Sequence, residues 1–211
     1  MSAYYNEIDP EPGPLLSAGT GENCDIIPRI LLLYVPPGSY LADVTYGKGA
    51  FWAKTDLSRY VFLPSDLNGI PPWNNCSIDF RHLPYQDRSI DCVVLDPPYM
   101  HGGKTVHSKI NDCYRNEATS HEDVIRLYAG GVLEAARVLR KGGIFIVKSQ
   151  DETESGQRFS HVELMQIMEM FGFKIVDLFV LLSNKAPMMR YDFQKTARKN
   201  HSYFLVGKFR R

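Results

Sequence analysis

The amino-acid sequence predicts one α/β domain with a doubly wound, mostly parallel β-sheet that helices cover on both faces. The chain has 211 residues, 44% of them hydrophobic, which is enough for one well-buried domain. From Leu41 onward, short apolar runs alternate with helical patterns, and this alternation is typical of βαβ units. The central runs are apolar nearly throughout, as expected for strands that are buried on both faces.

The N-terminal residues 1–24 are expected to form an extended arm, and residues 25–211 to form the domain. The arm is proline-rich at its start and has no hydrophobic periodicity. The longest apolar run, from Ile30 to Val35, is stopped by Pro36 and Pro37. Because a membrane span needs about 20 apolar residues, we predict no membrane partner.

The expected strands are short apolar segments bounded by turn residues. The last two follow each other with no helical pattern between them, so they are predicted to pair as an antiparallel hairpin at the sheet edge. The predicted fold is therefore a Rossmann-like, seven-stranded sheet. Its strands are expected at residues 40–44, 60–64, 77–80, 91–96, 143–149, 173–183 and 202–209.

Two helices have clear end signals. Ser120 and Asp123 form a capping-box pattern ahead of an amphipathic run, and Gly142 is expected to end this helix. The same start pattern recurs at Ser160 and Glu163, with Gly172 as the expected stop. Both helices are predicted to pack on the sheet.

Charge, cysteine and histidine content limit the function classes. The 24 basic and 24 acidic residues balance, so a nucleic acid would have to be bound by a local basic patch. The four cysteines form no close pair, and no secretory signal is present, so we expect a reduced protein in the cytoplasm. No two histidines have ligand spacing on a predicted helix, and we predict no metal.

The carboxyl ends of the first three expected strands carry candidate ligand-binding residues, since ligands bind at this edge of doubly wound sheets. The first strand leads into Asp43-Val-Thr45-Tyr-Gly47-Lys-Gly49, whose glycines allow a tight turn and close approach of a ligand. This loop has neither P-loop spacing nor a full GxGxxG pattern. Asp66 follows the second strand, and Asp79 and Phe80 end the third.

The fourth strand ends in Asp96-Pro97-Pro98-Tyr99. The prolines lack N–H groups and fix φ, which makes a rigid exit from the strand. Carbonyl groups and the Asp96 carboxylate then form a cluster of acceptors beside an aromatic ring. Such a cluster suits an amino group on a heteroaromatic ring.

These residues resemble those of the class I S-adenosylmethionine-dependent methyltransferases, specifically the amino-methyltransferases that modify exocyclic nitrogens of bases. The resemblance covers roughly residues 25–209, and its strongest element is the tetrapeptide DPPY at residues 96–99. It implies S-adenosylmethionine as the cofactor. Asp43, Thr45, Gly47 and Gly49 would shape the methionine side of the pocket, Asp66 would hold the ribose, and Asp79 with Phe80 would meet the adenine.

The resemblance also implies how the target base is held. Asp96 and the Pro97 carbonyl would accept hydrogen bonds from the amine, and Tyr99 would stack on the ring beside Pro98. A base inside a duplex cannot reach such a pocket, so the base would be flipped out or unpaired. Aspartate in the first motif position is more usual for adenine N6, and serine for cytosine N4, so we expect a site-specific adenine N6 DNA methyltransferase of the restriction-modification type.

Several alternatives stay open at this point. They are cytosine N4 methylation of DNA, methylation of adenine N6 or guanine N2 in RNA, and a noncatalytic subunit that keeps the fold. The chain has no evident target-recognition domain, so a specificity partner or a homodimer also remains open. Cytosine C5 methylation is not supported, because the chain lacks the Pro-Cys dipeptide of that family.

Two segments are predicted to contact the nucleic acid. The long, aperiodic segment 100–120 has the profile of a lid over the site, and the C-terminal segment 184–211 is rich in basic and aromatic residues. The candidate substrate-binding residues are His101, Lys104, Lys109 and Arg115 in the lid, and Lys185, Arg190, Lys195, Arg198 and Lys199 in the C-terminal segment.

Overall fold

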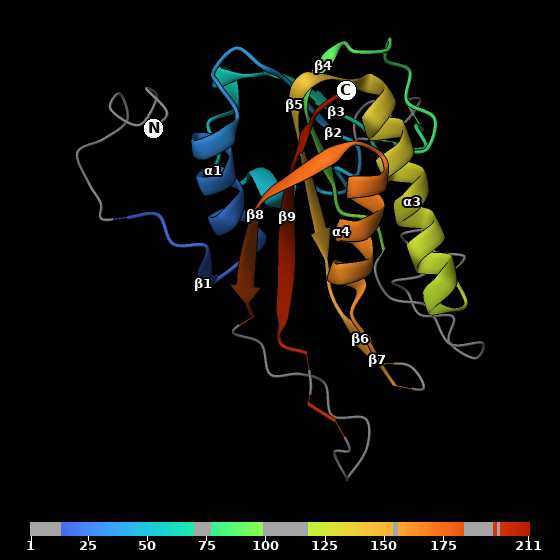
Figure 1. Ribbon diagram of the computed structural model, residues 1–211. Coiled ribbons are helices and arrows are strands. Elements are labelled where there is room, and N and C mark those ends of the chain that lie inside the picture. The colour runs from blue at the N-terminus through green and yellow to red at the C-terminus, as the bar shows by residue number, and fades with distance from the viewer. Residues whose placement is uncertain (1–13, 70–76, 99–117, 154–155, 184–195, 198) are drawn as a thin grey trace.

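A seven-stranded, mixed β-sheet forms the centre of the computed structural model (Figure 1). The structure describes residues 14–69, 77–98, 118–153, 156–183, 196–197 and 199–211. The strand order is β1-β8-β9-β5-β4-β2-β3. The strands are β1 (Ala18–Thr20), β2 (Tyr40–Asp43), β3 (Val61–Pro64), β4 (Ile90–Leu95), β5 (Leu139–Ser149), β8 (Phe173–Leu182) and β9 (His201–Phe209).

The predicted mostly parallel arrangement is confirmed. Strands β2, β3, β4 and β5 pair in parallel, and β1 pairs in parallel with β8. The predicted antiparallel hairpin of β8 and β9 is also present, and β9 pairs antiparallel with β5 on its other side. The predicted place of this hairpin at the sheet edge was wrong, because the three-residue β1 adds to the outside of β8 and forms the outermost strand on that side.

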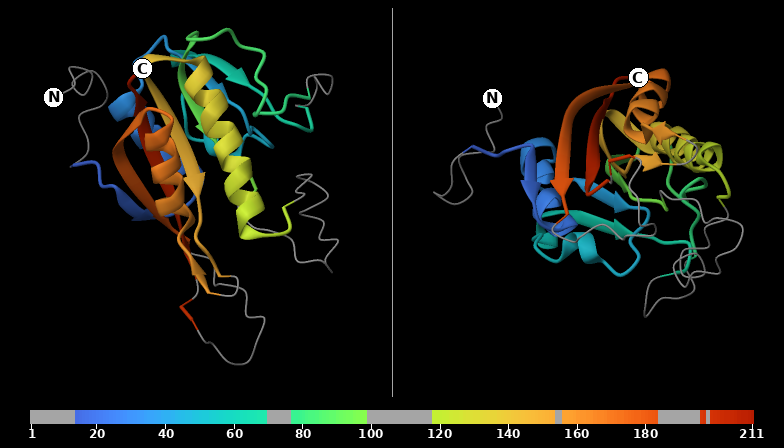
Figure 2. Two further views of the ribbon diagram at one scale, coloured as in Figure 1. Left: turned by 45° about the vertical axis from the view of Figure 1, so that its right-hand side comes forward. Right: turned by 90° about the horizontal axis from the view of Figure 1, so that it is seen from below.

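Helices cover both faces of the sheet, as a doubly wound fold requires (Figure 2). On one face lie α3 (His121–Val138) and α4 (Ser160–Met170), and on the other lie α1 (Asn23–Tyr34) and the short 3-10 helix η2 (Ala50–Trp52). A second 3-10 helix, η3 (Leu57–Arg59), precedes β3. Along β4, Val93 and Leu95 pack with the α3 and α4 side, and Cys92 and Val94 with the α1 side. Central strands are therefore apolar on both faces, which explains their uninterrupted hydrophobic sequence.

The prediction of a strand at residues 77–80 was wrong. Ser77 makes only an isolated parallel bridge with Asp66. The chain then turns, because the Asp79 carboxylate accepts a hydrogen bond from the Arg81 N–H, a local bond that competes with strand pairing. The seventh strand of the described sheet is instead β1, inside the segment expected to be an arm.

The helix-end predictions have different outcomes. The capping box at Ser120 and Asp123 is confirmed. Gly142 does not end this helix: the chain enters β5 directly at Leu139, and Gly142 lies within that strand where the register to β4 shifts. The second helix ends as expected, before Gly172.

The capping box predicted at Ser160 was wrong, although α4 starts at this residue. Ser160 is already the first helical residue, and its hydroxyl has no hydrogen-bond partner in the described structure. A carboxylate from another segment takes this role, because Asp151 accepts from the backbone N–H of His161 at 3.4 Å. Asp151 lies just before β6 (Glu152–Thr153), which pairs with β7 (Gln157–Arg158) in a separate two-stranded sheet.

Helix α1 was not predicted from the sequence pattern. It starts with Asn23, contains Pro28, and buries Ile26, Ile27, Ile30 and Leu31 against the sheet. Proline inside a helix removes one backbone hydrogen bond. The apolar face of α1 offsets that cost through tertiary packing, which short-range sequence signals do not reveal.

Candidate active site at the carboxyl edge of the sheet

The carboxyl ends of β2, β3 and β4 meet at one edge of the sheet. Asp43, the last residue of β2, is in register with Pro64 of β3 and Val94 of β4. Because the three strands are parallel, the segments that follow them leave the sheet side by side. This register brings Asp43, Asp66 and Asp96 into one region, as the sequence analysis expected.

Asp43 is a buried carboxylate, with 2% of its surface exposed. One oxygen accepts from the backbone N–H of Thr45 at 3.0 Å, and the other accepts from the indole N–H of Trp52 at 2.6 Å. Burial raises the pKa of Asp43 to about 7, and the nearby Asp96 and Asp66 carboxylates add to the rise against these two hydrogen bonds. Trp52, on η2, was not among the predicted site residues.

The glycine loop after β2 is held by the next strand end. Gly47 and Gly49 have φ values of 55° and 72°, a left-handed conformation that favours glycine. The Gly47 N–H donates to one oxygen of Asp66 at 2.9 Å, and Asn68 N–H donates to the other at 2.9 Å. Asp66 therefore fixes the shape of the loop. A Cβ on Gly47 would have no neighbour nearer than 4.0 Å, so the backbone here is open to a ligand.

The turn after β4 is tied directly to this loop. The backbone N–H of Asp96 donates to the Thr45 hydroxyl at 2.7 Å. Pro97 is buried and Pro98 partly buried. Within the described ranges, no hydrogen bond is seen to the Pro97 carbonyl, which leaves it available as an acceptor beside the Asp96 carboxylate.

Lys148 is a second residue of this site, besides Trp52, that was not predicted from the sequence. It lies on β5 with 6% exposure, and its Nζ is 3.3 and 3.2 Å from the two carboxylate oxygens of Asp96. Burial raises the pKa of Asp96, and the Lys148 ammonium opposes that rise. The signal in the sequence was a lysine directly after the apolar run Ile144–Val147 of a central strand, since a buried lysine needs a partner.

Asp79 and Phe80 lie in different surroundings. The Asp79 carboxylate forms a two-pronged ion pair with Arg81, with distances of 2.6 to 3.0 Å. This interaction holds the pKa of Asp79 below its usual range. The Phe80 ring is partly buried against the core, close to Gly131 of α3 and to Leu95.

Many of the predicted substrate contacts lie outside the residues that the structure describes. These are Tyr99, His101, Lys104, Lys109, Arg115, Lys185, Arg190, Lys195 and Arg198. Lys199 is described, and its Nζ lies 5.6 Å from the centre of the Phe159 ring, just before α4. Phe159 is 51% exposed, so this pair presents an aromatic ring and a cation to solvent.

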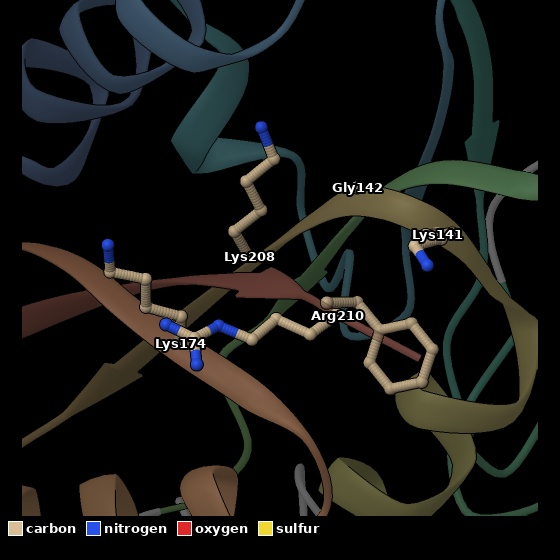
Figure 3. A pocket seen from close by; sticks show the side chains of 6 residues that line it. Lys141, Gly142, Lys174, Lys208 and Arg210 are labelled. Carbon is tan, nitrogen blue, oxygen red and sulfur yellow. The ribbon is translucent and has the colours of Figure 1, made fainter.

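A basic pocket of about 230 Å³ lies at the opposite edge of the sheet, where β5 and β8 begin and β9 ends (Figure 3). Lys208 and Arg210 of the predicted basic segment line it, together with Lys141 and Lys174. The C-terminal basic residues therefore do not form one surface, because Lys199 lies at the other end of β9.

The described residues contain neither a candidate membrane span nor a candidate metal centre. None of their helices has both the length and the apolar character that crossing a membrane requires. No three histidine, cysteine, aspartate or glutamate side chains among them are placed to bind one metal ion.

Comparison with known proteins identifies the fold. No family model and no curated protein matches the chain. Among solved structures, it is similar to 1,6-didemethyltoxoflavin-N1-methyltransferase from Burkholderia thailandensis, solved with bound 1,6-didemethyltoxoflavin and S-adenosylhomocysteine. The TM-score is 0.56 at 13% identity, covering 90% of this chain and 79% of that one.

Two further structures have the same fold. TrmN from Thermus thermophilus gives a TM-score of 0.55 at 14% identity, covering 86% of this chain and 47% of that one. An S-adenosylmethionine-dependent methyltransferase from Methanosarcina mazei gives 0.54 at 12% identity, covering 86% and 97%. The chain also spans 50% of the length of TTHA0409 from Thermus thermophilus, at a TM-score of 0.43. The protein thus has the Rossmann-like fold of S-adenosylmethionine-dependent methyltransferases.

Proposed function

We propose that this protein is an S-adenosylmethionine-dependent methyltransferase that modifies the exocyclic N6 amine of adenine in DNA. The observation that carries the proposal is the hydrogen bond from Asp96 N–H to the Thr45 hydroxyl. It joins the DPP turn, with its carboxylate and carbonyl acceptors, to the glycine loop expected to hold the cofactor. An amine held by the turn would then lie beside the transferable methyl group.

The residues at this edge suit S-adenosylmethionine, which supplies an electrophilic methyl group on a positively charged sulfonium. The carboxyl groups of Asp43, Asp66 and Asp96 lie near one another, since Asp96 and Asp66 both raise the pKa of Asp43. A cationic ligand would relieve their repulsion. Asp66 uses one lone pair of each oxygen for the loop and has others that can accept ribose hydroxyls.

The adenine of the cofactor would lie toward Asp79 and Phe80. Both oxygens of Asp79 already accept from Arg81, so in this proposal Asp79 contacts the ring through its remaining lone pairs with the ion pair intact. The partly buried Phe80 ring supplies apolar contact.

The chemistry required of the protein is positioning of a weak nucleophile. The lone pair of an exocyclic amine is delocalised into its ring. If Asp96 and the Pro97 carbonyl each accept one amine hydrogen, the nitrogen is favoured in a pyramidal form with its lone pair free. The lone pair takes the methyl group as the sulfur–methyl bond breaks, S-adenosylhomocysteine is released, and the methylated nitrogen loses one proton to solvent. Catalysis then comes from orientation and electrostatics, with no covalent enzyme intermediate.

We extend the proposal to the nucleic acid. Tyr99 stacks on the flipped base, which repays roughly 1 to 3 kcal/mol of the unstacking cost. Of the proposed basic contacts, Lys199 is the described one. Its position over the exposed Phe159 ring suits a cation and a stacking surface for a neighbouring nucleotide.

A direct test is to incubate the protein with labelled S-adenosylmethionine and with duplex DNA, single-stranded DNA or RNA in separate samples. Each sample is digested to nucleosides, and the labelled nucleoside is identified. Labelled N6-methyldeoxyadenosine that is lost in Asp96→Asn would support the proposal. Label in deoxycytidine or only in RNA would change the assigned target, and cofactor binding without transfer would indicate a noncatalytic subunit.

A further inference from the structure

We propose that Lys148 is a positioning residue that holds the Asp96 carboxylate ionised and in place as the acceptor for the target amine. This role rests on the proposed function, because it concerns the same reaction. It adds a residue from β5 to a site otherwise built from the ends of β2, β3 and β4.

The geometry of the pair is that of a buried, two-oxygen contact. The side chains of Lys148 and Asp96 are 7% and 20% exposed. The Nζ distances of 3.3 and 3.2 Å are nearly equal and longer than a typical charge-assisted hydrogen bond. Each carboxylate oxygen therefore keeps lone pairs for another donor.

Both partners are held from several sides. The Asp96 backbone is fixed by Thr45. The backbone carbonyl of Lys148 accepts from the buried Tyr128 hydroxyl at 2.8 Å, which ties β5 to α3. The Lys148 ammonium also lies 5.6 Å from the centre of the Phe51 ring on η2. Contacts from the loop after β2, from α3 and from η2 thus hold the ion pair between the end of β4 and β5.

The burial of Asp96 opposes the ionised carboxylate that an acceptor for the target amine needs. Two nearby acidic groups are Asp43, at the end of β2, and Asp66, after β3, and Asp96 and Asp66 both raise the pKa of Asp43. Burial raises the pKa of Asp96 and so favours its protonated form. A protonated carboxyl group would present a donor to an amine hydrogen, where an acceptor is needed. Lys148 is the charged group that opposes this.

The matched variants are Lys148→Met, which removes the charge at similar length, and Lys148→Arg, which keeps it. Lys174→Met, at the opposite edge of the sheet, is the control. In isotopically labelled protein, the carboxyl carbon signal of Asp96 is identified by NMR as the one that disappears in Asp96→Asn. Its chemical shift is then followed against pH in the wild type and in each lysine variant. We expect Lys148→Met to raise the pKa of Asp96 by about one pH unit or more, and Lys148→Arg and Lys174→Met to leave it nearly unchanged.

The pH profile of methyl transfer gives a second measurement. In Lys148→Met, the acid limb of kcat/KM should move to higher pH by the same amount, so that activity recovers in part at alkaline pH. A purely structural role would lower activity equally at every pH. If Lys148→Met does not fold, Lys148→Gln is measured in the same way.

The outcomes separate the two proposals. An Asp96 titration that is the same in the wild type and in Lys148→Met would overturn the role of Lys148. A raised Asp96 pKa in a protein that methylates no nucleic acid would support the ion-pair role and overturn the proposed reaction. If the acid limb of kcat/KM moves in Lys148→Met while the pKa of Asp96 does not, Lys148 does not act through this carboxylate.

Discussion

Two ion pairs near the strand ends have the same kind of chemistry and opposite electrostatic consequences. Lys148–Asp96 is largely buried, with side-chain exposures of 7% and 20%, whereas Arg81–Asp79 is open to solvent at 48% and 25%. Burial raises the pKa of Asp96 in spite of its partner, and Arg81 lowers the pKa of Asp79. The comparison indicates that the Lys148 contacts at 3.2 and 3.3 Å do not cancel the effect of burial on Asp96, whereas the shorter two-pronged contact with Arg81 outweighs it at Asp79.

The largest effect is expected from breaking the buried pair at the carboxylate. Asp96→Asn should lower methyl transfer roughly 100-fold or more, since the amide offers one acceptor and loses the charge that pairs with Lys148. Cofactor affinity, measured by calorimetry, should change much less than turnover. Turnover close to that of the wild type would rule out Asp96 as the amine acceptor.

The buried Asp43, next to Asp96, predicts that cofactor affinity depends on pH. The pKa of Asp43 is about 7, so its carboxylate becomes charged only as the pH rises through that value. Affinity for the cationic cofactor should therefore fall as the pH drops below about 7, by up to about tenfold per pH unit. Calorimetric titrations between about pH 5.5 and about pH 8.5 would measure this fall, and Asp43→Asn should flatten the curve.

The raised pKa of Asp43 also makes the free energy of unfolding of the cofactor-free protein depend on pH. The native pKa of Asp43 lies above the ordinary value of 3.8, so the native state binds more protons than the unfolded state between these two values. The contribution of Asp43 to stability is therefore greatest at low pH and is lost as the pH rises from about 4 to about 7. Denaturant unfolding of the wild type and Asp43→Asn would isolate it.

Breaking the exposed pair should have a small effect. Arg81→Ala removes a solvent-screened ion pair and is expected to change the free energy of unfolding by no more than about 1 kcal/mol. Methyl transfer should change only a few-fold. Thermal unfolding and kcat/KM measure the two effects, and a loss approaching that of Asp96→Asn would show that the two pairs are not as different as their burial suggests.

The smallest effect is expected at the opposite edge of the sheet. Lys174 and Lys208 face each other directly across β8 and β9 and line the basic pocket. Like charges in such a pair are destabilising, so Lys174→Thr should raise the free energy of unfolding by a few tenths of a kcal/mol. Methyl transfer should stay at the wild-type level. Reduced transfer would instead indicate that this edge takes part in substrate binding.

Local sequence signals predicted much of the fold. The capping box at Ser120 and Asp123, the antiparallel hairpin and the apolar central strands are all present. The failures involve competing contacts. The predicted strand at 77–80 gave way to a turn around Asp79, and α1 was missed because Pro28 argues against a helix that tertiary packing stabilises.

By itself, the sequence determined that Asp43, Asp66 and Asp96 stand at or just after the ends of three parallel strands, and therefore that they reach one edge of the sheet. Alternation and turn residues encode this information locally. Only the tertiary structure decided what these carboxylates meet: Trp52 for Asp43, Gly47 for Asp66 and Lys148 for Asp96. Lys148 and Asp96 are 52 residues apart in the chain. Their contact depends on β4 and β5 being neighbours in register, and no short-range pattern specifies that pairing.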